Sequence, residues 1–127
     1  HSANPLVCVA GITVLDEIKN KNLIREANRK GKFLINKLNE IKKKYTKRVN
    51  YVSGKGLIAA IMFRDARGKP DPALASKISE KCMQKGLLVV HTGRESIKIG
   101  PPLTITDEAL AEGLQVLEDS IHCSIYN

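Results

Sequence analysis

One lysine in the C-terminal third of the chain is placed to meet an anion. The segment Ile97-Lys98-Ile99 alternates apolar and charged residues, which predicts a strand with Lys98 on the face opposite its neighbours. Pro101 and Pro102 follow, and neither donates a backbone hydrogen bond, so strand pairing is expected to end there. A rigid strand would then offer one positive charge to a carboxylate, although an exposed strand lysine is also ordinary protein surface.

Two helices are predicted ahead of this strand. Asn4 suits a helix cap and Pro5 the first helical position, and apolar residues then cover nearly the whole circumference as far as Ile18. A helix that is apolar all round needs more cover than a small domain provides, so we expect a partner surface outside the chain. After residues 20–22, a second helix is predicted to about position 45, because apolar or small residues recur at steps of four and three: Ala27, Gly31, Leu34, Leu38, Ile41 and Tyr45.

The remaining residues predict a small sheet with two further helices. Strands are expected at 49–52, 57–63, 87–90 and 96–99, the second of them central, and helices at 72–85 and from Asp107 to about His122. The fold class is therefore α+β: a mainly antiparallel sheet of three to four strands, covered by helices on one face and preceded by a helical arm. We expect one domain over 1–127, with the arm at 1–47 and an α/β sandwich at 48–127.

Composition limits the function classes. With 127 residues, 43% hydrophobic content and a formal charge of +8, the chain is a basic globular domain. Much of the charge lies in the run 41–48, without aromatic pairs for base stacking, so we expect a solvated helix face; a basic nucleic-acid-binding or protein-interaction module is the alternative. The three cysteines lack C-x-x-C spacing, so we expect neither a disulfide framework nor a metal site. No membrane segment is predicted, and a cytoplasmic location is expected.

Three short motifs occur in a recognisable order: Ser2-Ala3-Asn4-Pro5-Leu6, Gly54-Lys55-Gly56-Leu57, and the stretch from Ile97 through the double proline to Ile105. Together they resemble the C-terminal small domain of class III aminotransferases, which are pyridoxal-phosphate enzymes acting on ω-amino acids of the 4-aminobutyrate and ornithine type. The resemblance spans essentially the whole chain. The glycines of the second motif also fit a tight turn, and they lack the serine or threonine of a nucleotide-binding loop.

The resemblance implies roles for two residues. In the family, the position of Lys98 is an arginine that grips the substrate carboxylate; here a point charge replaces a planar fork. Ser2 lies near the place where family members contact the cofactor phosphate, although a polar lead-in to the helix is the plainer interpretation. No metal ligand is implied.

The resemblance also implies what the chain lacks. The lysine that forms a Schiff base with pyridoxal phosphate lies in the family's upstream large domain, so no catalytic residue is expected within this chain. We therefore expect a fragment of a longer aminotransferase, inactive alone and without bound cofactor. Its expected partners are the upstream large domain and a second copy of the parent enzyme, as a homodimer. The sequence does not identify the amino donor.

Overall fold

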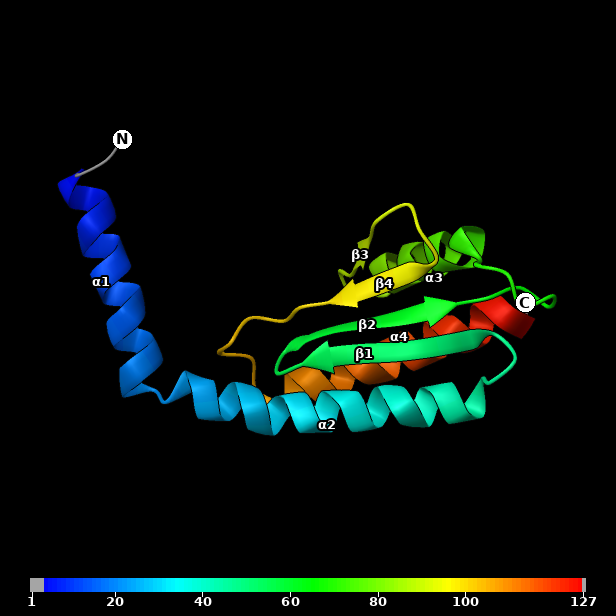
Figure 1. Ribbon diagram of the computed structural model, residues 1–127, viewed down its shortest axis with the longest axis horizontal. Helices are drawn as coiled ribbons and strands as arrows, with labels where there is room; N and C mark the ends of the chain where they lie inside the picture. The colour runs from blue at the N-terminus through cyan, green and yellow to red at the C-terminus, as the bar shows by residue number, and fades with distance from the viewer. Residues whose placement is uncertain (1–3, 127) are drawn as a thin grey trace.

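Four strands and four helices form within residues 4–126, the part of the chain that the computed structural model describes (Figure 1). In chain order they are α1 (Pro5–Asn20), α2 (Leu23–Lys44), β1 (Val49–Lys55), β2 (Ile58–Phe63), α3 (Pro72–Gln84), β3 (Val90–His91), β4 (Ser96–Ile99) and α4 (Asp107–Tyr126). The fold is α+β, as the sequence predicts.

The sheet has the order β1-β2-β4-β3, and every neighbouring pair is antiparallel. The apolar run of β2 is the second strand of this order and lies beside the short β4. The strand expected at 87–90 is wrong in its bounds, since β3 holds only Val90 and His91. Residues 87–89 are apolar but unpaired, and they line a cavity instead of extending the sheet.

One face of the sheet is covered by α2, α3 and α4, with α4 lying between the other two (Figure 1). Alternation along the strands directs their inward side chains to this face. The central buried residues of the sheet are Ala59, Ile61, Phe63 and Ile97. Although α2 lies within the 1–47 segment expected as an arm, it packs on the sheet and supplies Leu34, Leu38 and Ile41 to the core.

Local signals in the sequence explain where α3 and α4 begin. The Asp71 carboxylate accepts the backbone N–H of Leu74 at 2.9 Å, and Pro72 fills the first helical position. The Thr106 hydroxyl accepts from the N–H of Ala109 at 3.2 Å at the start of α4. The end of α4 expected near residue 122 is wrong, because burial continues along the helix to positions 124 and 125.

Two glycines let α2 touch the turn between β1 and β2. Gly56 has a positive φ of 57°, which glycine adopts without steric cost. Gly31 faces this turn so closely that a Cβ on it would lie 2.3 Å from the carbonyl oxygen of Gly56. The absence of a side chain at Gly31 thus admits the neighbouring backbone, and the contact fixes α2 against the hairpin.

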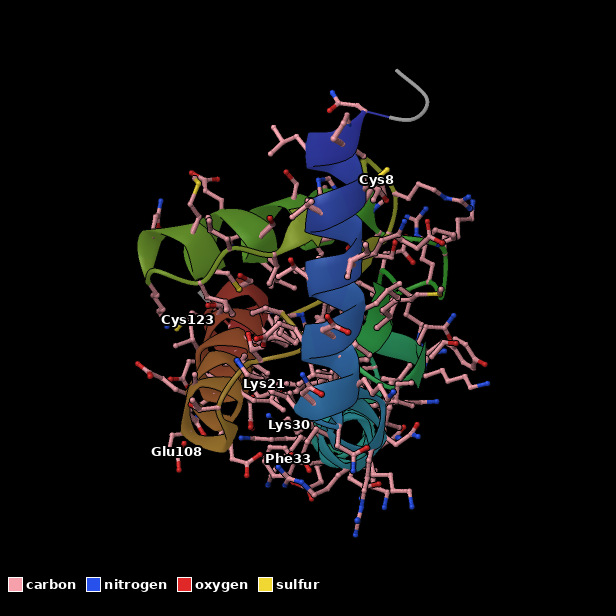
Figure 2. All side chains as sticks on the ribbon, turned by 90° about the vertical axis from the view of Figure 1, so that its left-hand side faces the viewer. Cys8, Lys21, Lys30, Phe33, Glu108 and Cys123 are labelled. Carbon is pink, nitrogen blue, oxygen red and sulfur yellow. The ribbon has the colours of Figure 1, made fainter. Side chains whose placement is uncertain are left out.

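Helix α1 stands away from this body. It is steeply inclined to α2 after a break at Asn22, whose φ is 51° (Figure 1), and Cys8 on it is exposed (labelled in Figure 2). None of its residues is buried; Leu6 is 76% exposed and Leu15 66%. The helix with the most continuous apolar surface is thus the one with the least cover.

Candidate functional site

Lys98 lies on the uncovered face of the sheet. In β4 it pairs with Ala60 of β2 on one side and with Val90 of β3 on the other, while Ile97 points into the core. The predicted alternation is therefore what the structure shows. Within residues 4–126, no carboxylate forms an ion pair with the Lys98 ammonium. The side chain is exposed and its charge is available to an external anion.

The surroundings of Lys98 on this face are mainly apolar. Ala60 and Met62 are half-buried beside it, and Val90, Tyr51 and Ile58 are 57%, 52% and 75% exposed. An isolated ammonium on such a surface attracts anions weakly in water, but more strongly once another surface covers it and excludes solvent. The arrangement suits a site that is completed by a second layer of protein.

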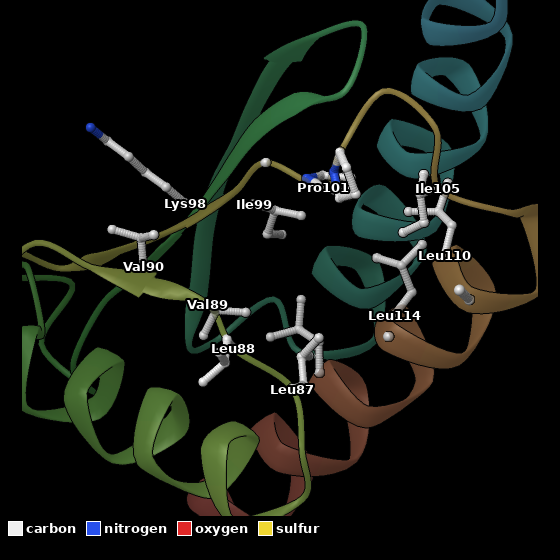
Figure 3. Close-up of a pocket in the computed structure, with 15 residues that line it drawn as sticks. Leu87, Leu88, Val89, Val90, Lys98, Ile99, Pro101, Ile105, Leu110 and Leu114 are labelled. Carbon is white, nitrogen blue, oxygen red and sulfur yellow. The ribbon is translucent and has the colours of Figure 1, made fainter.

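A cavity of about 290 Å³ opens at the edge of the sheet beside Lys98. Fifteen residues line it, drawn from residues 87–90, the end of β4, the double-proline connection and the first half of α4. Apart from Lys98, every lining residue is apolar or glycine. Figure 3 shows the Lys98 amino group pointing away from the cavity centre, so Lys98 contributes its stem to the rim and its charge to the open face.

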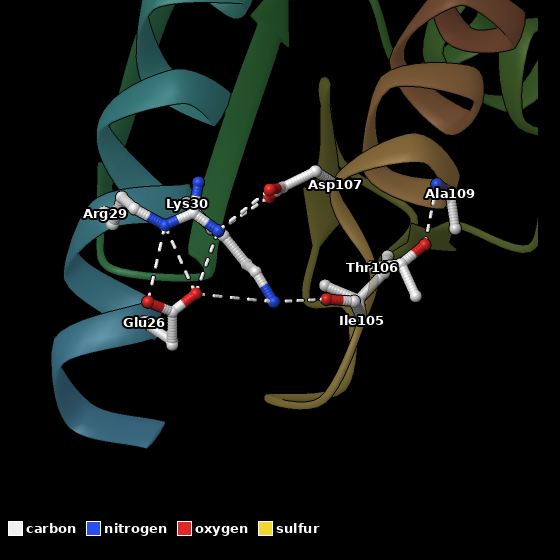
Figure 4. A network of polar contacts seen from close by, with 7 residues as sticks. All are labelled: Glu26, Arg29, Lys30, Ile105, Thr106, Asp107 and Ala109. Carbon is white, nitrogen blue, oxygen red and sulfur yellow. Dashed lines mark hydrogen bonds and ion pairs between the residues drawn. The ribbon is translucent and has the colours of Figure 1, made fainter. Parts of the chain in front are cut away.

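A polar network ties the connection after β4 to helix α2 (Figure 4). Arg29 donates to both Asp107 carboxylate oxygens, at 2.8 and 3.0 Å, and to Glu26 at 2.8 Å. The neighbouring Lys30 is 8% exposed and donates its ammonium to the backbone carbonyl of Ile105. The hydrogen bonds from Arg29 lower the pKa of both carboxyl groups and raise the pKa of the guanidinium.

Within residues 4–126, none of the other residues considered for the site forms a hydrogen bond or ion pair with Lys98. Ser2 lies outside the described residues. His91, in β3, has its Nε2 atom 3.0 Å from the carbonyl oxygen of Arg94. Two cations of the basic run are paired within the fold, Lys44 with Glu118 and Arg48 with a carboxylate of α3's cap. Lys44 and Arg48 are thus engaged away from Lys98, whereas His91 follows Val90, the β3 partner of Lys98.

The cavity beside Lys98 does not fit pyridoxal phosphate. A site for that cofactor needs an acidic partner for the pyridine nitrogen and donors around the phosphate, and the lining contains neither an acid nor a hydroxyl group. Among residues 4–126, no three His, Cys, Asp or Glu side chains are grouped to hold a metal ion. The helices of this part of the chain are all too short or too polar to cross a membrane.

The polar network is the part of the site that sequence reasoning missed. One signal was present: Lys30 is three residues after Ala27 and four before Leu34, so it lies on the buried side of α2. A lysine at such a position needs an acceptor for its ammonium. The partner, Ile105, is 75 residues away in the sequence, and no local pattern points to it.

Comparison with known proteins identifies the family. The family model "Aminotransferase class-III" matches residues 1–121. Similar curated proteins include an acetylornithine aminotransferase of Caldanaerobacter subterraneus subsp. tengcongensis, 35% identical over 116 residues (91% of this chain, 28% of the relative). A 4-aminobutyrate aminotransferase of Mycobacterium leprae is 32% identical over 117 residues (90% of this chain, 26% of the relative).

Among solved structures, a phospholyase from Arthrobacter in complex with phosphoethanolamine superimposes with a TM-score of 0.87 at 28% identity, covering 94% of this chain and 29% of that one. The chain thus spans between a quarter and a third of the length of these relatives. The family uses pyridoxal phosphate. The chain belongs to the class III aminotransferases and corresponds to their C-terminal small domain.

Proposed function

We propose that this domain is the substrate-facing lid of an enzyme that transfers an amino group from an ω-amino acid to a keto acid. Lys98 binds a carboxylate of the amino donor or of the keto acid. The observation that carries the proposal is the position of Lys98: an exposed ammonium on the uncovered face of the sheet, framed by apolar side chains and in no ion pair with the carboxylates of residues 4–126.

The chemistry of the substrates supports this role. Acetylornithine and 4-aminobutyrate, which name two of the similar enzymes, each carry a carboxylate, and so does every keto acid acceptor. An ammonium forms charge-assisted hydrogen bonds to a carboxylate but lacks the bidentate geometry of a guanidinium. Lys98 therefore selects for the charge of the carboxylate more than for its orientation, which suits an ω-amino acid whose chain length varies.

The catalytic groups belong to the parent enzyme outside this chain. Pyridoxal phosphate supplies the electron sink for amino transfer when it is bound there. The exposed apolar surface of α1 supports this proposal, because large exposed apolar areas in soluble proteins mark surfaces that contact another protein or domain. The upstream large domain and the second copy of a homodimer are the proposed occupants of this surface.

Carboxylate binding can be measured on the chain itself. Titration with glutarate, followed by amide NMR, should give saturable shifts in β4 and β2 for the wild type and none for Lys98→Met. Lys55→Met is the matched control: it removes an exposed lysine from the same sheet face and should bind as the wild type does. Lys98→Arg should bind more tightly through bidentate contact. Unchanged binding by Lys98→Met would refute the assignment.

The location of the chemistry has its own test. The chain mixed with pyridoxal phosphate, 4-aminobutyrate and 2-oxoglutarate should form no glutamate. Measurable, saturable transamination would overturn the proposal that the catalytic groups lie elsewhere. Because the similar Arthrobacter structure is a phospholyase, the parent's reaction is best assayed for both amino transfer and phosphate release.

A further inference from the structure

The connection between β4 and α4 contains few internal constraints of its own. It begins at Gly100 and runs through Pro101 and Pro102, which have no backbone N–H to donate. Within it, the N–H of Ile105 donates to the carbonyl of Pro102 at 3.0 Å, and at its end the Thr106 carbonyl accepts from Leu110 of α4 at 3.1 Å. Lys98 is paired with β2 and β3 in the sheet, and the connection leaves β4 two residues after it.

Two cations of α2 hold the far end of the connection, and they differ in burial. The pair between Arg29 and Asp107 is open to solvent, with side chains 52% and 57% exposed, so salt screens it. The side chain of Lys30 is only 10% exposed, and its ammonium reaches the Ile105 carbonyl with Glu26 at 3.9 Å behind it. A buried charge-assisted hydrogen bond is stronger than a surface ion pair and is little affected by salt.

We propose that Lys30 is a positioning residue: its ammonium fixes the carbonyl of Ile105 and with it the 100–105 connection, which forms one wall of the cavity beside Lys98. Ile105 lines that cavity and is partly buried against the core. Loss of the ammonium leaves the half-buried Ile105 carbonyl without its donor, so the connection loses its link to α2 and is free to move.

The wild-type chain provides the first test. A lysine ammonium held by a buried carbonyl exchanges its protons slowly, so its side-chain ¹⁵N resonance should be visible and should couple through the hydrogen bond to the ¹³C carbonyl of Ile105. Exposed lysines such as Lys32 should give no such signal. Absence of a protected Lys30 resonance would overturn the proposal without any variant being made.

The second test uses Lys30→Met, with Lys32→Met as the control that removes the same charge from an exposed site on the same helix. Hydrogen exchange of the Ile105 amide, which bonds to the Pro102 carbonyl, should accelerate by about tenfold or more in Lys30→Met, because a hydrogen bond to a charged group is lost. The Ile105 carbonyl resonance should also shift. Core amides of β2 should keep their protection. Uniform acceleration across the domain would show a purely structural role and refute positioning.

This inference rests on the proposed function only in its last step. If Lys98 binds glutarate, Lys30→Met should weaken that binding while Lys32→Met leaves it unchanged. If the wild type binds no glutarate, the proposed role of Lys98 fails, yet the exchange and carbonyl measurements still decide whether Lys30 holds the connection. Glutarate affinity that is unaffected by Lys30→Met would refute the link between the two lysines.

Discussion

The close contact between α2 and the β1–β2 turn makes Gly31→Ala a severe test of the fold. The added Cβ would lie 2.3 Å from the Gly56 carbonyl oxygen and 2.5 Å from its carbonyl carbon and Cα. All three are backbone atoms, so no side chain can rotate away. The helix and the hairpin must separate, and the hairpin carries β2, the strand that pairs with the strand of Lys98.

The free energy of the change has two parts of opposite sign. Alanine is favoured over glycine in a helix interior by about 1 kcal/mol. Overpacking costs about 1 to 3 kcal/mol, and a clash with backbone places Gly31→Ala at the upper end, about 3 kcal/mol. We therefore expect a net loss of about 2 kcal/mol in the free energy of unfolding. With a urea m value of about 1.5 kcal/mol/M, this lowers the unfolding midpoint by roughly 1.3 M.

Gly113→Ala is the matched control. It is the same substitution within α4, but its Cβ would meet only the flexible Cδ1 of Leu87, at 3.3 Å. The helix propensity then dominates, and we expect Gly113→Ala to be neutral or stabilised by a few tenths of a kcal/mol. Equal urea midpoints for the two variants, or a stabilised Gly31→Ala, would refute the reasoning from close backbone approach.

Three further outcomes follow from single contacts. Asp71→Ala removes both the cap of α3 and the ion-pair partner of Arg48, so the free energy of unfolding, measured by heat or urea, should fall by about 2 kcal/mol. Asp71→Asn keeps the cap and should lose about half as much. Arg29 lowers the pKa of Asp107, so their pairing stabilises the fold at neutral pH and is lost as the pH falls through that depressed pKa; Asp107→Asn should flatten this acid limb of the stability curve. Burial raises the pKa of the Cys82 thiol, which should react with Ellman's reagent only on unfolding, unlike the exposed α1 cysteine.

Much of the architecture could be read from local patterns. The Asp71-Pro72 start of α3 and the uncovered face of Lys98 depend on neighbours within a few residues, and the structure shows both. The strand expected at 87–90 failed because a short apolar run does not reveal whether it finds a hydrogen-bonding partner. Arg29 and Lys30 anchor the connection through contacts with residues more than 70 positions away. The helical spacing indicates that Lys30 is buried, but no local pattern identifies the residue that it contacts.

The isolation of α1 separates its thermodynamics from those of the body. A helix of 16 residues without buried side chains is held by its own backbone hydrogen bonds, the Asn4 cap at 3.0 Å and a single Lys21–Glu17 pair. Peptides of this length lie near the threshold where helix and coil are comparable in free energy. Its helicity should thus melt gradually on heating, whereas the sheet unfolds cooperatively. Any surface that binds α1 must also offset the conformational entropy that the helix loses when it becomes ordered.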